Sequence, residues 1–231
     1  MSKINYKSEF LNLVNDLTLI NKSIIIDKNG DNILVKRNDS DKSVAYVLGA
    51  PNEYFGMTSE QIAFYNYTEF FQFLSTMENP DISIKDSKIV LNKGKTKINY
   101  LLSNPESIQP GPKQIDFANV DYEFELDAAT IDELNKMHSL IKAKRCSFTT
   151  KGDEITLKIF NNDKDNSFQK KLPLTRVSST QEEVDFKIFS EIVTKIPSKR
   201  NYKVSIKNPG YLEFDLVDES IDLKIYTALC R

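Results

Sequence analysis

Residues 121–141 read DYEFELDAATIDELNKMHSLI, and this stretch decides the fold. Tyr122, Phe124 and Leu126 alternate with two glutamates, which is the pattern of a strand with one buried face. A helix follows directly, because Thr130 and Glu133 have the spacing of a capping box and the apolar residues after them recur on one helix face. The stretch therefore predicts a strand followed at once by a helix.

The same order of elements occurs in both halves of the chain. In each half a helix is followed by three strands, an extended segment, a short helix and three more strands, which indicates an internal duplication. The two short helices are expected to bury Phe73 and Phe189 among their apolar side chains. The expected helices cover residues 6–20, 68–77, 130–141 and 189–196, and the expected strands and extended segments cover 24–26, 33–35, 44–48, 61–65, 82–84, 88–91, 97–102, 122–126, 147–151, 155–159, 168–174, 184–187, 202–206, 212–216 and 221–225.

A segment rich in proline separates the halves. It contains Pro105, Pro110, Gly111 and Pro112, a composition that suits an extended connector better than part of a core. We therefore expect two domains, residues 1–103 and 120–231, joined by a connector over residues 104–119. The fold class is expected to be α+β, with large antiparallel sheets covered by helices on one face.

The 231-residue chain has an ordinary globular composition, with 40% hydrophobic and 28% charged residues. No apolar run is long enough to cross a bilayer, and the start of the sequence lacks the apolar core of a secretory signal. We therefore expect a cytoplasmic protein with no membrane partner. The net charge of −2 conceals separate blocks, since residues 121–127 and 213–222 carry only acids and residues 195–203 only bases. Such blocks indicate one acidic and one basic surface.

Motifs for catalysis or for binding a cofactor are missing from the sequence. It has no GxGxxG, P-loop, HExxH or Cys/His zinc spacing. Its single histidine, His138, is expected to be a core residue of its helix, and Cys146 and Cys230 are expected to be buried thiols. We therefore expect no enzymatic activity, no cofactor and no metal site.

Several short stretches resemble one protein family. They are residues 13–21 (LVNDLTLIN), 70–75 (FFQFLS) and 131–134 (IDEL), and a Pro-containing turn that leads from Ile196-Pro197 to Asn201-Tyr202. Together with the duplication and the connector, they resemble the trimeric sliding clamps of T-even-type phages, DNA polymerase processivity factors similar to proliferating cell nuclear antigen. The resemblance is spread over most of the chain.

The resemblance implies a DNA clamp fold that closes as a homotrimer into a ring of six similar domains. Sheets would form the outside of the ring, and two helices per domain would line the hole. Edge strands of neighbouring subunits would pair, residues 97–102 with 168–174, and within one subunit residues 44–48 would pair with 223–228. The interface residues implied are Lys97, Ile98, Tyr100, Leu102, Phe168, Lys170, Leu172 and Leu174.

A clamp that slides needs many weak phosphate contacts and no reading of bases. The partners implied are duplex DNA of any sequence, a DNA polymerase, a clamp loader and transcription factors. Helices of the first half present uncharged side chains, so we expect weak DNA affinity that is concentrated on the second domain. The candidate phosphate contacts are Lys22, Lys136, Lys142, Lys144, Arg145, Lys195, Lys199 and Arg200.

Client proteins of this family carry short peptides whose apolar anchors fill a pocket under the connector. The candidate pocket residues here are Val44, Ile108, Ile115, Tyr226, Ala228 and Leu229. An alternative is that Tyr226 and Leu229 only complete the last strand.

Two other functions remain open from the sequence. One is a duplicated, strand-rich phage structural or assembly protein without a DNA role. The other is a monomeric single-strand binder that stacks bases on aromatic rings, although most of the tyrosines and phenylalanines occupy core positions of the expected elements. A trimer in solution would favour the clamp.

Overall fold

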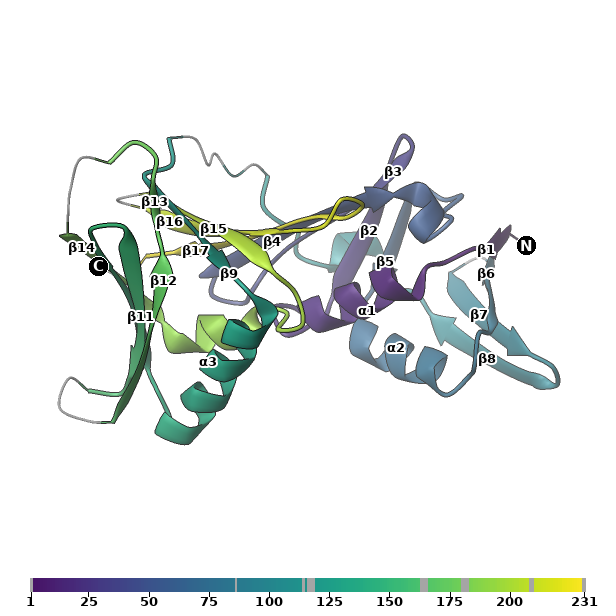
Figure 1. The fold of residues 1–231 in the computed structure, drawn as a ribbon. Helices are drawn as coiled ribbons and strands as arrows, with labels where there is room; N and C mark the ends of the chain where they lie inside the picture. The colour runs from purple at the N-terminus through teal and green to yellow at the C-terminus, as the bar shows by residue number, and fades with distance from the viewer. Residues whose placement is uncertain are drawn as a thin grey trace. The chain divides into compact units, whose positions relative to one another are not determined.

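The computed structural model describes residues 2–85, 87–113, 115, 119–162, 166–179, 183–207 and 210–229. They form two compact units, whose elements are labelled in Figure 1. Unit 1 comprises Met1–Ser40, Tyr46–Pro112 and Ser220–Asp222, and unit 2 comprises Asp41–Ala45, Lys113–Glu219 and Leu223–Arg231.

Strands of unit 1 form two groups. The first is an antiparallel sheet in the order β1-β6-β7-β8, and the second has the order β4-β3-β2-β5, in which β4 starts in unit 2 and continues in unit 1. The bounds are β1 (Ser2–Ile4), β2 (Ile24–Asn29), β3 (Asn32–Asn38), β4 (Val44–Pro51), β5 (Gln61–Phe64), β6 (Asp81–Lys85), β7 (Lys88–Lys93) and β8 (Thr96–Leu101).

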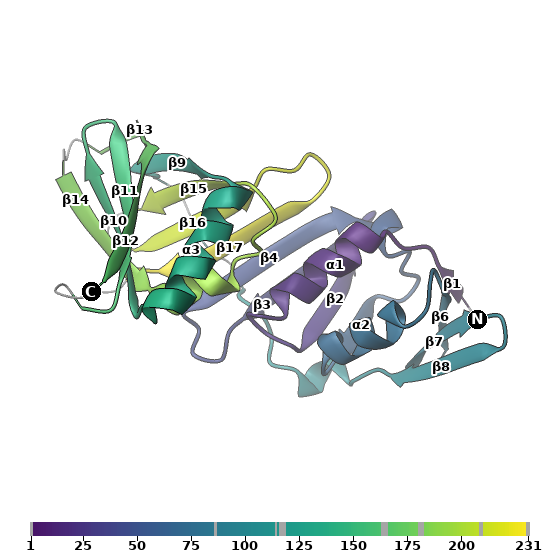
Figure 2. The same cartoon turned by 60° about the horizontal axis from the view of Figure 1, so that its bottom comes forward.

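Two α-helices of unit 1, α1 (Ser8–Leu17) and α2 (Tyr67–Ser75), lie side by side (Figure 2). The short 3-10 helices η1 (Asn52–Tyr54) and η2 (Pro105–Ser107) complete the unit. α1 forms because its apolar side chains fall on one face, and these side chains are buried. An aromatic cluster joins α2 to the strands on both sides: the Phe70 ring lies 4.9 Å from Phe64 of β5 and 5.5 Å from Tyr100 of β8, measured between ring centroids. Each such buried ring contributes about 2–3 kcal/mol.

Unit 2 repeats this plan. One sheet has the order β12-β11-β10-β14, and the other strands have the order β13-β9-β15-β16-β17, with α3 (Ala128–Ile141) packed against β11. At the end of β17 the Ala228 N–H donates to the Ser43 carbonyl (3.4 Å), so the expected pairing of 44–48 with 223–228 is confirmed for the part of β4 that belongs to unit 2. The bounds are β9 (Tyr122–Leu126), β10 (Arg145–Lys151), β11 (Glu154–Phe160), β12 (Ser167–Pro173), β13 (Thr175–Arg176), β14 (Glu183–Phe189), β15 (Tyr202–Lys207), β16 (Tyr211–Leu216) and β17 (Asp222–Ala228).

The structure corrects three local predictions. The fourth expected helix is the 3-10 helix η3 (Ser190–Lys195), because a run of β-branched residues and the proline after Ile196 both disfavour the α conformation. Phe189 ends β14 instead of starting that helix and is 50% exposed. Phe73 of α2 is 37% exposed, and its ring lies edge-on to that of Tyr100 with the centroids 6.3 Å apart.

Candidate functional site

In each unit, one sheet ends in a strand whose outer side pairs with no other described strand. This edge strand is β8 in unit 1 and β12 in unit 2. The Leu102 N–H donates to the Ser87 carbonyl (2.8 Å), and the Leu174 N–H donates to the Asp153 carbonyl (2.9 Å). Because successive residues of a strand direct their backbone groups to opposite sides, those of Asn99 on β8 and of Gln169 on β12 point away from the sheet. Both edges can therefore accept a further strand.

Two residues of the expected edge set, Tyr100 and Leu174, are buried. On β8, Lys97 is exposed and Ile98 and Leu102 are half-buried, but Tyr100 is only 7% exposed while Leu101, which the sequence did not single out, is 73% exposed. The Tyr100 hydroxyl donates to the Asn66 carbonyl (2.9 Å), and this contact holds the ring inside unit 1.

On β12 the expected side chains are half-buried or buried. Phe168, Lys170 and Leu172 are half-buried, and Leu174 is 7% exposed. Lys170 Nζ lies 2.8 Å from a Glu133 carboxylate oxygen of α3, and Lys171 Nζ lies 2.8 Å from Glu154. The two lysines are thus neutralised within unit 2, so their charge does not by itself oppose a basic strand such as β8.

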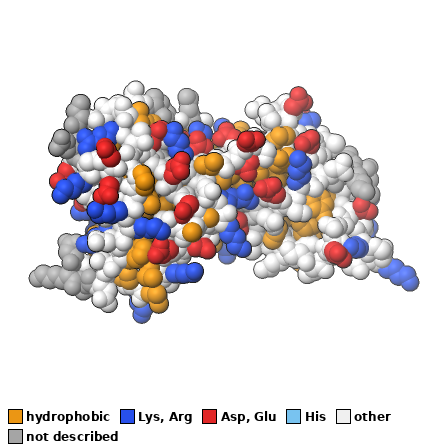
Figure 3. All heavy atoms as spheres, viewed as in Figure 1, with side chains coloured by type: hydrophobic (Ala, Val, Ile, Leu, Met, Phe, Trp, Pro, Cys, Tyr) orange, Lys and Arg blue, Asp and Glu red, His pale blue; other side chains and the backbone are white. Residues whose placement is uncertain are grey.

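Four exposed bases lie on α3 and directly after it. Lys136 lies on its outer face, Lys142 is its C-cap with a left-handed backbone (φ 53°), and Lys144 and Arg145 lead into β10. None of the four forms an ion pair with a described residue. Leu140, which is 75% exposed, lies among them, and Figure 3 shows blue and orange side chains next to one another over α3.

The other candidate phosphate contacts lie apart from α3 along the chain. Lys22 is exposed at the turn after α1 in unit 1. In unit 2, Lys195 is the last residue of η3 and is half-buried, Lys199 is exposed and Arg200 is half-buried. The exposed faces of α1 and α2 carry Ser8, Asn12, Gln72 and Ser75, and neither helix contains a base.

The candidate peptide-pocket residues are divided between the two units. Ile108, in unit 1, is 6% exposed where η2 ends. In unit 2, Val44 is 1% exposed, Tyr226 is 8% exposed, Ala228 is exposed, and Ile115 and Leu229 are half-buried. Leu229 follows the last residue of β17, and its N–H donates to the Gly210 carbonyl (2.9 Å).

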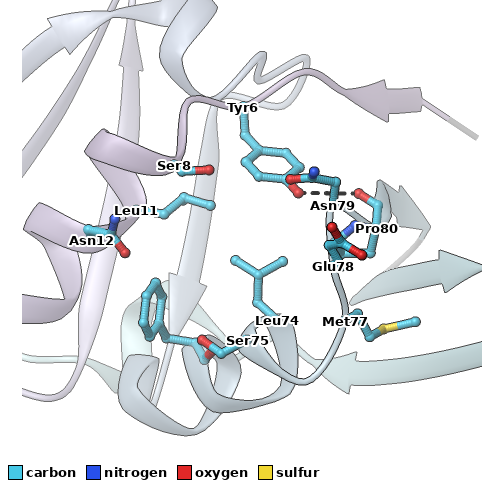
Figure 4. A pocket seen from close by; sticks show the side chains of 11 residues that line it. Tyr6, Ser8, Leu11, Asn12, Leu74, Ser75, Met77, Glu78, Asn79 and Pro80 are labelled. Carbon is cyan, nitrogen blue, oxygen red and sulfur yellow. Dashed lines mark hydrogen bonds between the residues drawn. The ribbon is translucent and has the colours of Figure 1, made fainter.

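A cavity of about 230 Å³ opens between α1 and α2, and the sequence did not predict it (Figure 4). Its apolar lining includes Leu11, Leu74 and Met77, and Ser75 and Asn79 contribute polar groups. The Tyr6 hydroxyl reaches the Pro80 carbonyl at 3.4 Å on one side of the cavity. Two titratable side chains, Tyr6 and Glu78, also belong to the lining.

The described part of the chain offers neither a cluster of metal ligands nor a readily ionised thiol. No three His, Cys, Asp or Glu side chains there lie close enough to hold a metal ion. Cys146 is a free, fully buried thiol, and burial raises its pKa to about 12, which keeps it protonated; Cys230 lies outside the described residues. None of the described helices is long and apolar enough to span a membrane.

Solved structures of known proteins match the whole chain. The PCNA of A. fulgidus, in a structure with the C-terminal region of FEN-1, superposes with a TM-score of 0.75 at 13% identity, over 100% of this chain and 99% of that chain. Proliferating Cellular Nuclear Antigen from Entamoeba histolytica gives a TM-score of 0.78 at 16% identity, over 100% and 98%. PCNA from Thermococcus kodakaraensis gives 0.76 at 14%, over 99% and 99%.

The chain has the PCNA-like DNA clamp fold. No protein-family profile matches the sequence, and no curated protein matches it either. At such low identity the likeness lies in the order and pairing of elements, so the clamp fold is shown by structure and not by shared residues. The α+β class and the clamp architecture expected from the sequence are confirmed.

Sequence reasoning missed two features of this clamp fold. Leu101 was passed over because Tyr100 beside it reads as the apolar residue of the strand, although strict alternation from Tyr100 would have placed Leu101 outside. Arg37 of β3 was also missed: it follows Ile33 and Val35 at alternate positions, and this spacing was the available signal that it is buried.

Proposed function

We propose that this chain is the subunit of a sliding clamp that encircles duplex DNA and tethers a DNA polymerase as a processivity factor. The observation that carries the proposal is a full-length clamp fold with an open edge strand in each unit. Pairing of β8 with β12 of the next copy gives a head-to-tail contact, which forms a closed ring when its rotation closes. We infer a homotrimer of the T-even phage type, with residues 1–103 and 120–231 as clamp domains and 104–119 as the connector; the compact units, which divide at Pro112, support this division.

DNA contact in this proposal falls mainly to unit 2. The exposed bases around the end of α3 are oriented to solvent and free of ion pairs with described residues, which suits weak phosphate contacts that are equal at every position on DNA. We assign the same role to Lys22, Lys195, Lys199 and Arg200. The helices α1 and α2 expose Glu9, Asp16 and Glu69 and contain no base, which keeps the affinity low, as a sliding ring needs.

In this proposal, client proteins dock through apolar residues of the connector and of the C-terminal tail. The A. fulgidus PCNA structure contains the C-terminal region of FEN-1, so a clamp of this fold can hold a terminal peptide of a partner. We propose that Val44, Ile108, Ile115, Tyr226, Ala228 and Leu229 receive apolar anchors of a polymerase peptide, and that a clamp loader and transcription factors use the same pocket.

Two measurements test the assembly and its role. Light scattering should give three times the subunit mass of 26.5 kDa, and a ring loaded on nicked circular DNA should stay bound in high salt but leave the same DNA once it is linearised. A strict monomer at high concentration would refute the trimer. Equal loss from circular and linear DNA would refute encirclement and favour a strand-rich structural protein instead.

A further inference from the structure

Two charged side chains, Arg37 and Asp39, are buried in unit 1, and Arg37 is the more deeply buried of the two. Arg37, near the end of β3, occupies the buried row of that strand after Ile33 and Val35, and only 2% of its surface is exposed. Burial is costly for a guanidinium, because the group loses its hydration unless hydrogen bonds replace it. The hydrogen bonds that Arg37 donates therefore indicate its structural role.

Those bonds lead to the connector. One terminal nitrogen of Arg37 donates to the main-chain carbonyl of Gln109, and the other donates to the Ser23 hydroxyl at 2.8 Å. Ser23 in turn donates to the Asn21 side-chain oxygen (2.8 Å), and the Asn21 amide nitrogen donates to the Asn38 carbonyl (2.7 Å). A continuous chain of hydrogen bonds thus joins the start of β2, the end of β3 and the connector.

The residue before Arg37 makes a second contact with the same segment. A Cβ added to Gly111 would overlap the Lys36 carbonyl oxygen and come within 2.7 Å of the Lys36 Cβ. Only a glycine lets the connector backbone approach β3 so closely. Gln109 and Gly111 are therefore fixed on neighbouring residues of one strand, directly after the buried Ile108.

We propose that Arg37 is a positioning residue for client binding: it holds residues 108–112 of the connector on β3 before a partner peptide arrives. This inference rests on the proposed function, since it concerns the pocket that the connector helps to form. A segment that is already ordered does not have to be ordered on binding, and the affinity for the peptide rises accordingly. Arg37 acts through the connector and does not itself touch the peptide.

The first test measures the connector without any partner. In the assembled protein, amide hydrogen exchange over residues 104–113 should accelerate about tenfold in Arg37→Met, which keeps the apolar stem but leaves the Gln109 carbonyl without its donor. Gly111→Ala, which changes no charge, should accelerate exchange in the same segment. Lys36→Met is the matched control, because it removes a cation from the position directly before Arg37 on β3 and should leave exchange unchanged. Unchanged exchange in both Arg37→Met and Gly111→Ala would overturn the proposal.

The second test measures affinity for the labelled C-terminal peptide of the DNA polymerase encoded by the same genome. Binding should be about tenfold weaker in Arg37→Met, intermediate in Arg37→Lys, which restores one donor, and unchanged in Lys36→Met. Equal affinity of wild type and Arg37→Met would overturn the proposal even if exchange had accelerated. Absence of binding by the wild type would instead refute the proposed client pocket. Faster exchange in Arg37→Met would then show that Arg37 holds the connector on β3 without a role in client binding.

Discussion

Among the residues of the proposed client pocket, Leu229 is the one that lies just beyond the end of β17. Its main chain is held by the bond from its N–H to Gly210, while its side chain remains half-buried beyond the end of β17. Tyr226 is nearly covered and belongs to the strand itself. Leu229 therefore has more exposed apolar surface to offer to a partner than Tyr226 has.

Leu229→Asp should weaken binding of the polymerase C-terminal peptide by at least about tenfold, because a carboxylate in an apolar pocket must give up its hydration when the anchor enters. Fluorescence anisotropy with the labelled peptide measures the effect. Val217→Asp is the control, since Val217 is 64% exposed at the end of β16 and takes no part in the proposed pocket. If both variants bind like wild type, Leu229 has no place in the pocket.

Individual residues also show where sequence reasoning stopped. The row Ile33, Val35 and Arg37 obeys strict alternation, but a charged residue in a core is recognised only when its hydrogen-bond partners are known, and Gln109 is far along the chain. The exposure of Leu101 and the burial of Tyr100 depend in the same way on α2, which packs over Tyr100. Contacts between segments that are distant in the sequence decide whether such side chains are buried, and hydrophobic periodicity alone does not reveal these contacts.

At the scale of elements, α3 illustrates which local signals were sufficient. Its apolar face and its extent were predicted, but its N-cap is Asp127 and not Thr130: an Asp127 carboxylate oxygen accepts the Thr130 N–H at 2.7 Å. Bonds from the Thr130 side chain and main chain lower the pKa of Asp127. Asp127 therefore stabilises the start of the helix in its charged form.

Asp127→Ala should lower the free energy of unfolding by about 1 kcal/mol, since the cap acceptor is lost. The pKa of Asp127 is depressed on folding, so its contribution is present above its unfolded value of 3.8 and is lost as the pH falls through the folded value. Thermal unfolding at pH 7 and at pH 3 measures both effects, and the gap between wild type and Asp127→Ala should narrow at the lower pH. Asp127→Asn keeps the acceptor but loses the charge, so at pH 7 its stability should lie between those of wild type and Asp127→Ala; an equal loss in both variants would contradict the capping role.

Short elements were harder to predict than long ones. Strands such as β2 and β3, with an Asn-Gly turn between them, were placed correctly because turn chemistry and alternation agree. η3 was expected to be an α-helix, since its buried Ile192, Val193 and Ile196 fit a helical face almost as well as a 3-10 turn. A segment of six residues contains too few helical turns for its apolar pattern to distinguish an α-helix from a 3-10 helix.

At the scale of the whole molecule, function depends on how the open edges are used. An exposed edge strand is an aggregation hazard unless a defined neighbour covers it, and in the proposed ring each β8 edge would be covered by β12 of a neighbouring copy. The sheet β12-β11-β10-β14 has two edges among the described residues, β12 and β14. The proposed ring uses β12 alone, which allows the two edges to be compared within one sheet.

Gln169→Pro should convert the trimer to monomers at micromolar concentration while leaving the subunit folded. Gln169 directs its backbone away from β11, so the substitution removes a hydrogen bond to the next copy and none within unit 2. Lys187→Pro is the matched control on β14. The Ser190 N–H donates to the Lys144 carbonyl, so the backbone of Ser190 faces β10. Because backbone groups alternate along a strand, those of Lys187 point away from β10. Sedimentation equilibrium should report monomer for the first variant and trimer for the second, with similar melting temperatures. If Lys187→Pro dissociated the ring and Gln169→Pro did not, copies would join through β14, and the head-to-tail pairing of β8 with β12 would have to be abandoned.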